Sequence, residues 1–146
     1  MRSGGEWIGD TGAAMSRQNV DTAKRIYASR NRGDVGAVLA ECDPDVEWHP
    51  HLATVSRQPI RGHDGVRKYL VSLQEDWESF HHEPEQFFDA GDKVVVFLHT
   101  YARGRASGVD VDVPVAHVLT FERGKCLEFV SYHDRAKALE VAGLEE

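Results

Sequence analysis

Cysteine is scarce in this chain, and its placement is informative. Cys42 and Cys126 lie far apart in the sequence and form no CxxC or other metal-ligand spacing. This disfavours a disulfide framework or a cysteine-based metal site. Each cysteine lies on an apolar segment, so we expect two buried free thiols and a reducing, cytoplasmic location.

Positive charge and long apolar runs are also lacking. The 146 residues carry 17 Lys and Arg against 24 Asp and Glu, a formal net charge of −7. The basic residues are scattered among carboxylates, which disfavours nucleic acid and anionic membranes as partners. No apolar run reaches the length of a signal peptide or a membrane span. Nucleophile-elbow, P-loop and dinucleotide glycine motifs are absent as well.

The first fifteen residues are rich in glycine and other small residues. We expect residues 1–15 to form a disordered tail, with Met15 as a second plausible start of translation. The remaining residues, 16–146, fit one domain large enough to bury a core that contains a cavity.

Hydrophobic periodicity predicts an α+β fold, with helices packed on one face of an antiparallel sheet. The expected helices begin at Asn19, run from Val35 to Cys42 with Asp34 as the cap, from Asp64 to Phe80, and from Arg135 to Val141. The expected strands are Val46–His49, Glu85–Asp89, Lys93–Arg103, Val109–Glu122 and Lys125–His133, with a loop at His51–Gly62.

The segment Val109–Glu122 places one apolar stripe on its odd-numbered positions, interrupted only by His117. A turn at Arg105–Gly108 would place Arg103 opposite Asp110 and Val96 opposite His117, so both strands present an apolar face. A buried imidazole must be hydrogen-bonded or must face a cavity, so His117 is either a core residue or a pocket residue.

The opposite face of this hairpin carries Phe97, His99 and Tyr101. That is more aromatic surface than a solvated sheet face usually shows, so we expect a homodimer contact here. The alternative is a solvated face with ordinary exposed aromatics.

The last strand allows two orientations. A two-residue turn at Arg123-Gly124 would turn Cys126, Glu128, Val130 and Tyr132 inward, whereas a turn with a glycine bulge would turn Leu127, Phe129, Ser131 and His133 inward. In either case Tyr132 or His133 is expected to reach the pocket.

Five short motifs, in this order and spacing, carry a resemblance. They are N-R-G-D at Asn31–Asp34, D-P-D-V-E-W at Asp43–Trp48, I-R-G-H-D-G-V at Ile60–Val66, F-E-R-G-K at Phe121–Lys125 and Y-H-D-R-A-K-A-L at Tyr132–Leu139. The chain resembles the SnoaL-like branch of the NTF2-like superfamily from Asn19 to Leu144. The resemblance implies a curved sheet wrapped by helices into a cone with one apolar pocket and no cofactor. Members include polyketide cyclases, ketosteroid isomerases, dehydratases and epoxide hydrolases.

The resemblance places two histidines at catalytic positions. His49 stands where the isomerases keep their general-base aspartate, and His117 where they keep a protonated aspartate that binds the oxyanion. Ile26 takes the place of the oxyanion tyrosine, with Tyr27 one residue away. Two imidazoles cannot reproduce the carboxylate chemistry, so a standard steroid isomerase is disfavoured. The Asp-Arg-Asp set of limonene-type epoxide hydrolases is disfavoured too, because the available carboxylates lie on the wrong face.

His49 and His117 are therefore the candidate catalytic pair, acting by proton transfer on a small hydrophobic carbonyl compound in an isomerisation, cyclisation or dehydration. Such a pair predicts a limb near pH 6–7 in the pH–rate profile. The candidate pocket residues are Tyr27, Trp48, Tyr69, Trp77, Leu98, Val115, Leu119 and Tyr132.

Other functions remain open at this point. The main alternative is a non-catalytic ligand-binding or dimerisation module. A protein-transport adaptor is disfavoured, because no partner motif is visible. His49-Pro50-His51 suggests a metal site, but the proline distorts the strand and no third ligand has a fixed spacing, so we expect no metal.

Overall fold

The computed structural model describes residues 4–50 and 59–144, and side chains from Ser16 onward within them. The helices are α1 (Gly4–Arg32), α2 (Val35–Ala40), α3 (Gly62–Asp76) and α4 (Arg135–Val141). The strands are β1 (Cys42–His49), β2 (Ile60–Arg61), β3 (Trp77–Ala90), β4 (Lys93–Gly104), β5 (Asp110–Glu122) and β6 (Lys125–Tyr132). Among the described helices, none combines the length and the apolar character needed to cross a membrane.

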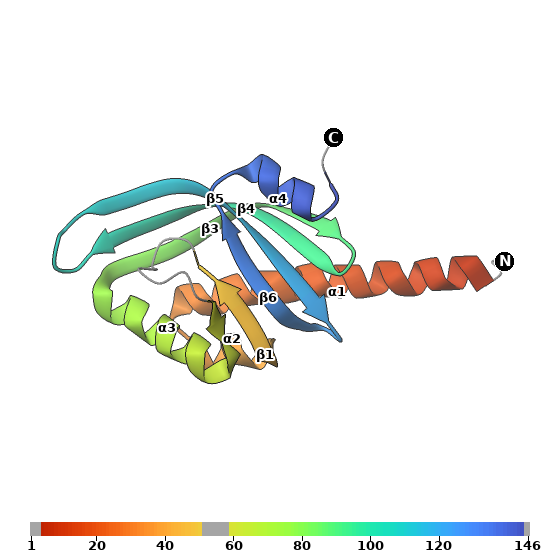
Figure 1. Ribbon diagram of the computed structural model, residues 1–146, viewed down its shortest axis with the longest axis horizontal. Helices are drawn as coiled ribbons and strands as arrows, with labels where there is room; N and C mark the ends of the chain where they lie inside the picture. The colour runs from red at the N-terminus through yellow and green to blue at the C-terminus, as the bar shows by residue number, and fades with distance from the viewer. Residues whose placement is uncertain (1–3, 51–58, 145–146) are drawn as a thin grey trace.

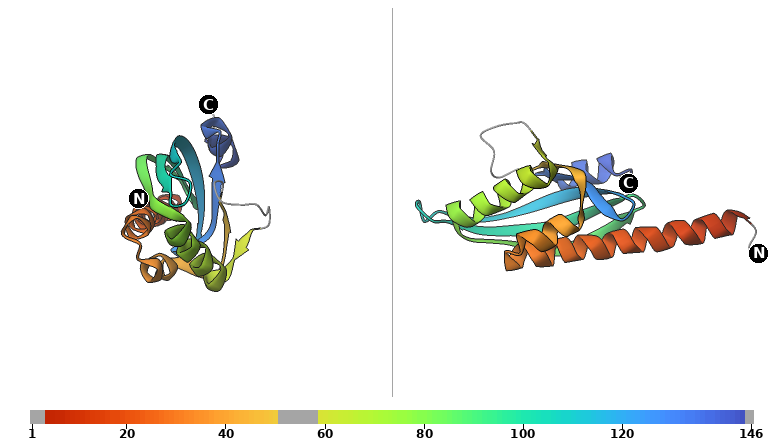
Figure 2. Two further views of the ribbon diagram at one scale, coloured as in Figure 1. Left: turned by 90° about the vertical axis from the view of Figure 1, so that its left-hand side faces the viewer. Right: turned by 90° about the horizontal axis from the view of Figure 1, so that it is seen from below.

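The strands form one curved six-stranded sheet in the order β2-β1-β6-β5-β4-β3, with β1 and β6 parallel and the other neighbours antiparallel. α1, α2 and α3 gather on the inner side of the curve, whereas α4 lies on the outer side (Figures 1 and 2). The predicted α+β cone is thereby confirmed. The core lies between the inner face and α1 and α3.

The central hairpin has the predicted register. Arg103 lies opposite Asp110, and Val96 lies opposite His117. Val94, Val96, Leu98 and Thr100 on the inner face of β4 are fully buried. Because side chains alternate between faces, this register alone decides that His117 points inward.

The first helix is longer than expected. α1 begins at Gly4 rather than Asn19, so the prediction of a disordered tail over residues 1–15 is wrong for residues 4–15, which are helical. No proline precedes Pro44, and Ala13, Ala14 and Met15 are strong helix formers, so the helix continues through this stretch despite its glycines. This end of α1 extends beyond the sheet (Figure 2).

The long helix is shorter than expected. α3 ends at Asp76 instead of Phe80, so Trp77 and Phe80 lie on β3. The cause is a tertiary contact: the guanidinium of Arg105, from the β4–β5 turn, donates to the carbonyls of Gln74, Glu75 and Trp77 at 3.1–3.2 Å. These carbonyls at the helix end lose their partners where the helix stops, and Arg105 satisfies them.

The last strand combines the two expected orientations. Arg123 and Gly124 form a two-residue turn with φ of 54° and 79°. A bulge follows, because Phe121 pairs with Cys126 but Thr120 pairs with Glu128. Cys126, Phe129 and Ser131 therefore face inward, and the prediction that Tyr132 or His133 reaches the pocket is wrong.

The two cysteines meet expectation. Cys42 and Cys126 are buried and free, and they are paired residues on β1 and β6. The predicted loop at His51–Gly62 lies mostly outside the described residues, and its end is β2.

The inner stripe predicts a large stability difference between the two faces of the hairpin. Leu98→Ala removes a fully buried side chain and is expected to cost about 2–5 kcal/mol of unfolding free energy. Asp112→Ala, on the outer face at a side chain 67% exposed, is the control and is expected to change stability by less than about 0.5 kcal/mol. Urea denaturation measures both, and equal losses would contradict the assignment of faces.

Candidate functional site

A two-chambered cavity opens between the helices and the inner face of the sheet. The outer chamber, of about 320 Å³, lies among the end of α1, α2, α3 and the start of β3. The inner chamber, of about 20 Å³, has room for about one water molecule. Arg30, Phe80 and His82 line both chambers, so these three side chains stand between the outer chamber and the inner one.

His82 is the buried imidazole at this junction. Its side chain is 4% exposed, and its Nδ1 lies 3.0 Å from Oγ1 of Thr100, the residue opposite it on β4. Among the described residues this is the only hydrogen bond of the ring, which leaves Nε2 for a molecule in the cavity. Burial, then the charge of Arg30 and the ring of His117, lower the pKa of His82 well below the ordinary histidine value. The imidazole is therefore neutral at physiological pH.

Two further hydrogen bonds fix the backbone of His82 to the end of α1. Asn31 donates from Nδ2 to the His82 carbonyl at 2.7 Å and accepts from the His82 N–H at 3.0 Å. Asn31 is thus a positioning residue, because it fixes the backbone of His82 relative to the end of α1. It belongs to the N-R-G-D motif, which ends α1 and provides the Asp34 cap of α2.

His117 is tied to α1 rather than open to the outer chamber. Its Nδ1 lies 2.6 Å from the Tyr27 hydroxyl, and the two rings stack. Both side chains are at most 3% exposed, and burial raises the pKa of Tyr27 well above the usual tyrosine value. The ring of His82 stands perpendicular to that of His117 at 5.3 Å. His117 therefore supports His82 from behind and touches only the inner chamber.

Arg30 supplies the positive charge of the cavity. Its guanidinium lies over the rings of Trp48 and Phe129, at 5.0 and 5.6 Å, and contacts the Tyr69 hydroxyl. Burial lowers the pKa of Arg30, with the two tyrosine hydroxyls opposing the shift. No carboxylate of the described residues forms an ion pair with this guanidinium.

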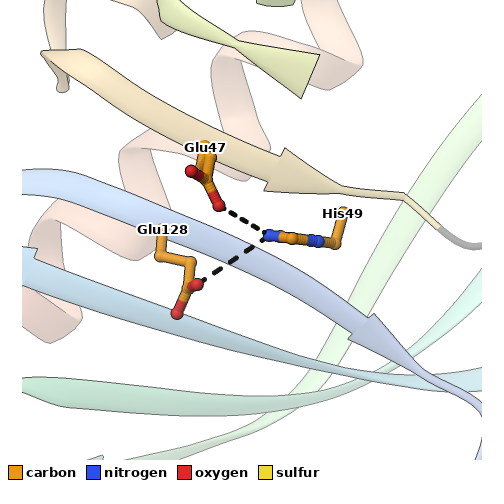
Figure 3. Close-up of side chains that lie close together, drawn as sticks. All are labelled: Glu47, His49 and Glu128. Carbon is orange, nitrogen blue, oxygen red and sulfur yellow. Dashed lines mark hydrogen bonds and ion pairs between the residues drawn. The ribbon is translucent and has the colours of Figure 1, made fainter. Parts of the chain in front are cut away.

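The expectation that His49 shares a pocket with His117 is wrong. His49 lies on the outer face of β1, opposite to Trp48, because Pro50 does not reverse the alternation of the strand. Its Nε2 lies 3.1 Å from Glu47 and 3.8 Å from Glu128 (Figure 3). These three half-buried side chains could supply metal-ligand atoms within 4.8 Å of one another, although Arg61 already lies 3.6 Å from Glu47.

The predicted pocket residues lie in four different locations. Trp77 lines the outer chamber, whereas Trp48, Tyr69 and Val115 line the inner chamber. Tyr27, Leu98 and Leu119 are buried in the core and line neither chamber. Tyr132 packs on the outer side of the sheet against the cluster that α4 covers.

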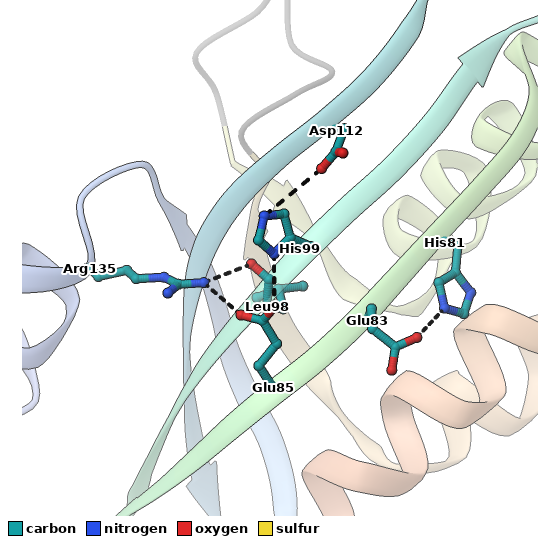
Figure 4. A network of polar contacts seen from close by, with 7 residues as sticks. All are labelled: His81, Glu83, Glu85, Leu98, His99, Asp112 and Arg135. Carbon is teal, nitrogen blue, oxygen red and sulfur yellow. Dashed lines mark hydrogen bonds and ion pairs between the residues drawn. The ribbon is translucent and has the colours of Figure 1, made fainter.

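The outer face holds a polar network instead of a bare aromatic patch. Glu85 accepts from His99 at 2.9 Å and from Arg135 at 3.0 Å, and His99 also faces Asp112 (Figure 4). The hydrogen bond from His99 is the main cause that lowers the pKa of Glu85. Phe97 lies under the Arg135 guanidinium, so α4 already covers it, while Tyr101 stays 42% exposed.

Sequence reasoning missed His82, Arg30, Asn31 and Phe80 as site residues. His82 was hidden because the predicted helix ran to Phe80 and left His81-His82 in a connection. The signal was present: Phe80, His82 and Pro84 alternate as on a strand, and the hairpin extended by one strand places His82 opposite Thr100. Nothing in the sequence marks Arg30, since its burial depends on the packing of α1 against Trp48 and Phe129.

Comparison with known proteins identifies the family. The model of the SnoaL-like domain matches residues 23–129. The chain belongs to the SnoaL-like family. An NTF2-like protein from Burkholderia thailandensis is 27% identical, with a TM-score of 0.72 over 86% of this chain and 95% of that chain.

Two more distant structures share the fold alone. A putative SnoaL-like polyketide cyclase from a Jannaschia species is 21% identical, with a TM-score of 0.70 over 89% of this chain and 94% of that one. A protein with a ketosteroid isomerase-like fold from Catenulispora acidiphila, in complex with trimethylamine, is 15% identical, with a TM-score of 0.69 over 84% and 92%. No protein with a curated description matches the chain.

The buried neutral imidazole predicts a loss of stability in acid. The pKa of His82 is lower in the folded state than in the unfolded state, so between the two values the unfolded chain binds more protons. Stability from this group is complete above about pH 6.5, the unfolded value, and falls as the pH drops toward the folded value, by up to about 1.4 kcal/mol per pH unit. Urea denaturation of the wild type from about pH 7.5 to about pH 5, a range that brackets the ordinary titration of histidine, measures the slope.

His82→Gln is expected to flatten that slope. His81→Gln is the matched control, because His81 is the adjacent residue but is 47% exposed and paired with Glu83 at 2.8 Å. Equal slopes in the wild type and His82→Gln would show that His82 does not titrate differently on unfolding.

Proposed function

We propose that this SnoaL-like protein binds a small, largely apolar carbonyl compound in the two-chambered cavity and transfers a proton on it without a cofactor, as an isomerase, cyclase or dehydratase. The observation that carries the proposal is the placement of His82: a buried, neutral imidazole that lines both chambers, fixed by Thr100 and Asn31, whose Nε2 has no hydrogen-bond partner among the described residues. His82 takes the role that the sequence assigned to His49.

The chemistry required is modest. A neutral imidazole within hydrogen-bond reach of an α-carbon proton removes it as a general base, and the resulting imidazolium returns the proton to another atom of the same substrate. Return to a different carbon is an isomerisation, and transfer to a departing hydroxyl is a dehydration. Arg30, beside His82, stabilises the negative charge that develops on the substrate oxygen.

His117 and Tyr27 are positioning residues in this scheme. Their 2.6 Å hydrogen bond holds the His117 ring perpendicular to that of His82, so His82 cannot rotate toward the core. The size of the outer chamber, about 320 Å³, lies at the lower end of ligand pockets and favours a small substrate.

Deuterium exchange tests the proposal even where the reaction product is unidentified. The protein is incubated in D₂O with a panel of small enolisable ketones and aromatic polyketides, and loss of the α-proton signal is followed by NMR. Wild type is expected to accelerate exchange of at least one compound. His82→Gln is expected to lower the rate at least about a hundredfold, because it removes the base.

His81→Gln serves as the control and is expected to keep the wild-type rate, since its side chain lies outside the cavity. Equal rates in the two variants would overturn the role of His82. Ligand-induced stabilisation without any exchange would instead support the alternative function, a non-catalytic ligand-binding module.

The pH profile of exchange gives a separate prediction. The base is active when neutral, and burial holds the pKa of His82 well below the ordinary value. The rate is therefore expected to stay level from about pH 8 down to about pH 6.5 and to fall only in more acidic solution. This places the limb lower than the pH 6–7 that two ordinary imidazoles would give, and a limb at or above about pH 7 would contradict the assignment.

The homodimer contact and the cytoplasmic location stay predictions. The proposed dimer surface is the outer sheet face around His99 and Tyr101, next to the part that α4 covers. The stacked rings of these two residues form its exposed aromatic centre.

A further inference from the structure

At the inner end of the cavity, Arg30 is a cation without a counter-ion among the described side chains. Arg30 has five N–H donors, and its contacts among the described residues are two aromatic faces and one phenol hydroxyl. Residues 51–58, outside the described part of the chain, contain no Asp or Glu. Arg30 is half-buried, and the partial loss of hydration of a guanidinium is costly unless an anion compensates for it, so an anion bound here would be stabilising.

A second donor beside Arg30 is also unsatisfied. Trp48 is 1% exposed, lines the inner chamber, and its indole Nε1 has no hydrogen-bond partner among the described residues. Buried indole N–H groups usually find an acceptor, and an unpaired one costs about 1–3 kcal/mol. The Arg30 guanidinium lies 5.0 Å from the centroid of the Trp48 ring, so a charged donor and a neutral donor that both lack an acceptor among the described residues are neighbours.

The residues that line the outer chamber carry more positive than negative charge, whereas the whole chain is negatively charged. The formal net charge is −7, yet the outer chamber is lined by three arginines, Arg30, Arg32 and Arg105, against two carboxylates, Asp34 and Glu78. One of these carboxylates, Asp34, lies 3.7 Å from Arg32 and so balances a surface arginine rather than Arg30. Neither Arg105 nor Arg30 forms an ion pair with a carboxylate of the described residues, but Arg105 is bonded to three backbone carbonyls at the end of α3, whereas Arg30 faces aromatic rings.

We propose that the inner end of the cavity is an anion site, where Arg30 and the indole N–H of Trp48 bind the carboxylate of a small, flat, apolar acid. The flat shape follows from the aromatic walls of the outer chamber, Trp77 and Phe80, which must hold the apolar body of the acid, and the small size follows from its volume of about 320 Å³. The inference deepens the proposed function, on which it rests for the location of the ligand: the substrate of His82 is an acid that enters as an anion.

Paired probes test this directly. The Kd values of 2-naphthoate and of its neutral analogue 2-naphthamide are measured by calorimetry. Wild type is expected to bind the acid at least about tenfold more tightly, the size of one charge-assisted hydrogen bond. Arg30→Met keeps the aliphatic stem and is expected to lose the preference while still binding the amide. Arg25→Gln, at a side chain 56% exposed on the same helix and in the lining of neither chamber, is the control and is expected to keep it.

A spectroscopic readout separates binding from folding. The indole N–H resonance of Trp48, assigned with Trp48→Phe, is expected to shift when naphthoate is added and to stay in place with the amide. If Arg30→Met does not fold, Arg30→Lys retains the charge without the planar fork and is expected to keep only part of the preference.

The outcomes distinguish this inference from the proposed function. Equal affinity for the two probes in wild type, or an unchanged preference in Arg30→Met, overturns the anion site while leaving deuterium exchange at His82 to stand. A preserved preference for the acid without any exchange activity supports the anion site and overturns the catalytic function. Absence of binding by either probe overturns the anion site.

Discussion

The hydrogen bond between Tyr27 and His117 connects the two halves of the structure. It joins the middle of α1 to the middle of β5 across a largely apolar core, and at 2.6 Å with both groups buried it satisfies polar atoms that would be costly to leave unpaired. Together with the bonds of Asn19 to Gly91 and of Asn31 to His82, the pair fixes where α1 lies on the inner face of the sheet. The same placement brings Asn31 to the backbone of His82 and Arg30 to the rings of Trp48 and Phe129. The cavity therefore depends on one contact between residues ninety positions apart in the chain.

The curvature of the sheet and the end of α3 set the size of that cavity. Because of the bulge after Cys126, the residues that follow it on β6 point to the opposite face from the one that strict alternation would give. Phe129 therefore lines the inner chamber, and Ser131 lies opposite His117. At the other end, Arg105 from the β4–β5 turn holds the last carbonyls of α3. The chain then turns into β3 at Trp77, and Phe80 and His82 enter the cavity from a strand. A helix that continued to Phe80 would have filled the outer chamber with its own backbone.

The sequence predicted the features that depend on neighbouring residues. Alternation along β4 and β5 determined their register, the inward direction of His117 and the polarity of the outer face, because period and pairing are local properties. It also predicted the Asp34 cap and the bounds of α4. It failed where a distant contact decides the result. The end of α3 depends on Arg105, the face of Ser131 on a bulge, and the burial of Arg30 on aromatic rings from two other strands. His49 was assigned from a family position, and the strict alternation of β1 places it on the opposite face from Trp48.

The charge of Arg30 links ligand binding to the basicity of His82. In the empty cavity this guanidinium is one of the causes that lower the pKa of His82, after burial itself. An anion bound to Arg30 would neutralise that charge, and the opposing effect on the imidazolium would disappear. Filling the outer chamber would at the same time exclude water and increase burial, which acts in the other direction. The pKa of His82 in the complex is the balance of these two effects. Because the cation and the imidazole line both chambers, and because ligands of the same shape exclude water equally, an acidic substrate would leave His82 a stronger base than a neutral one would.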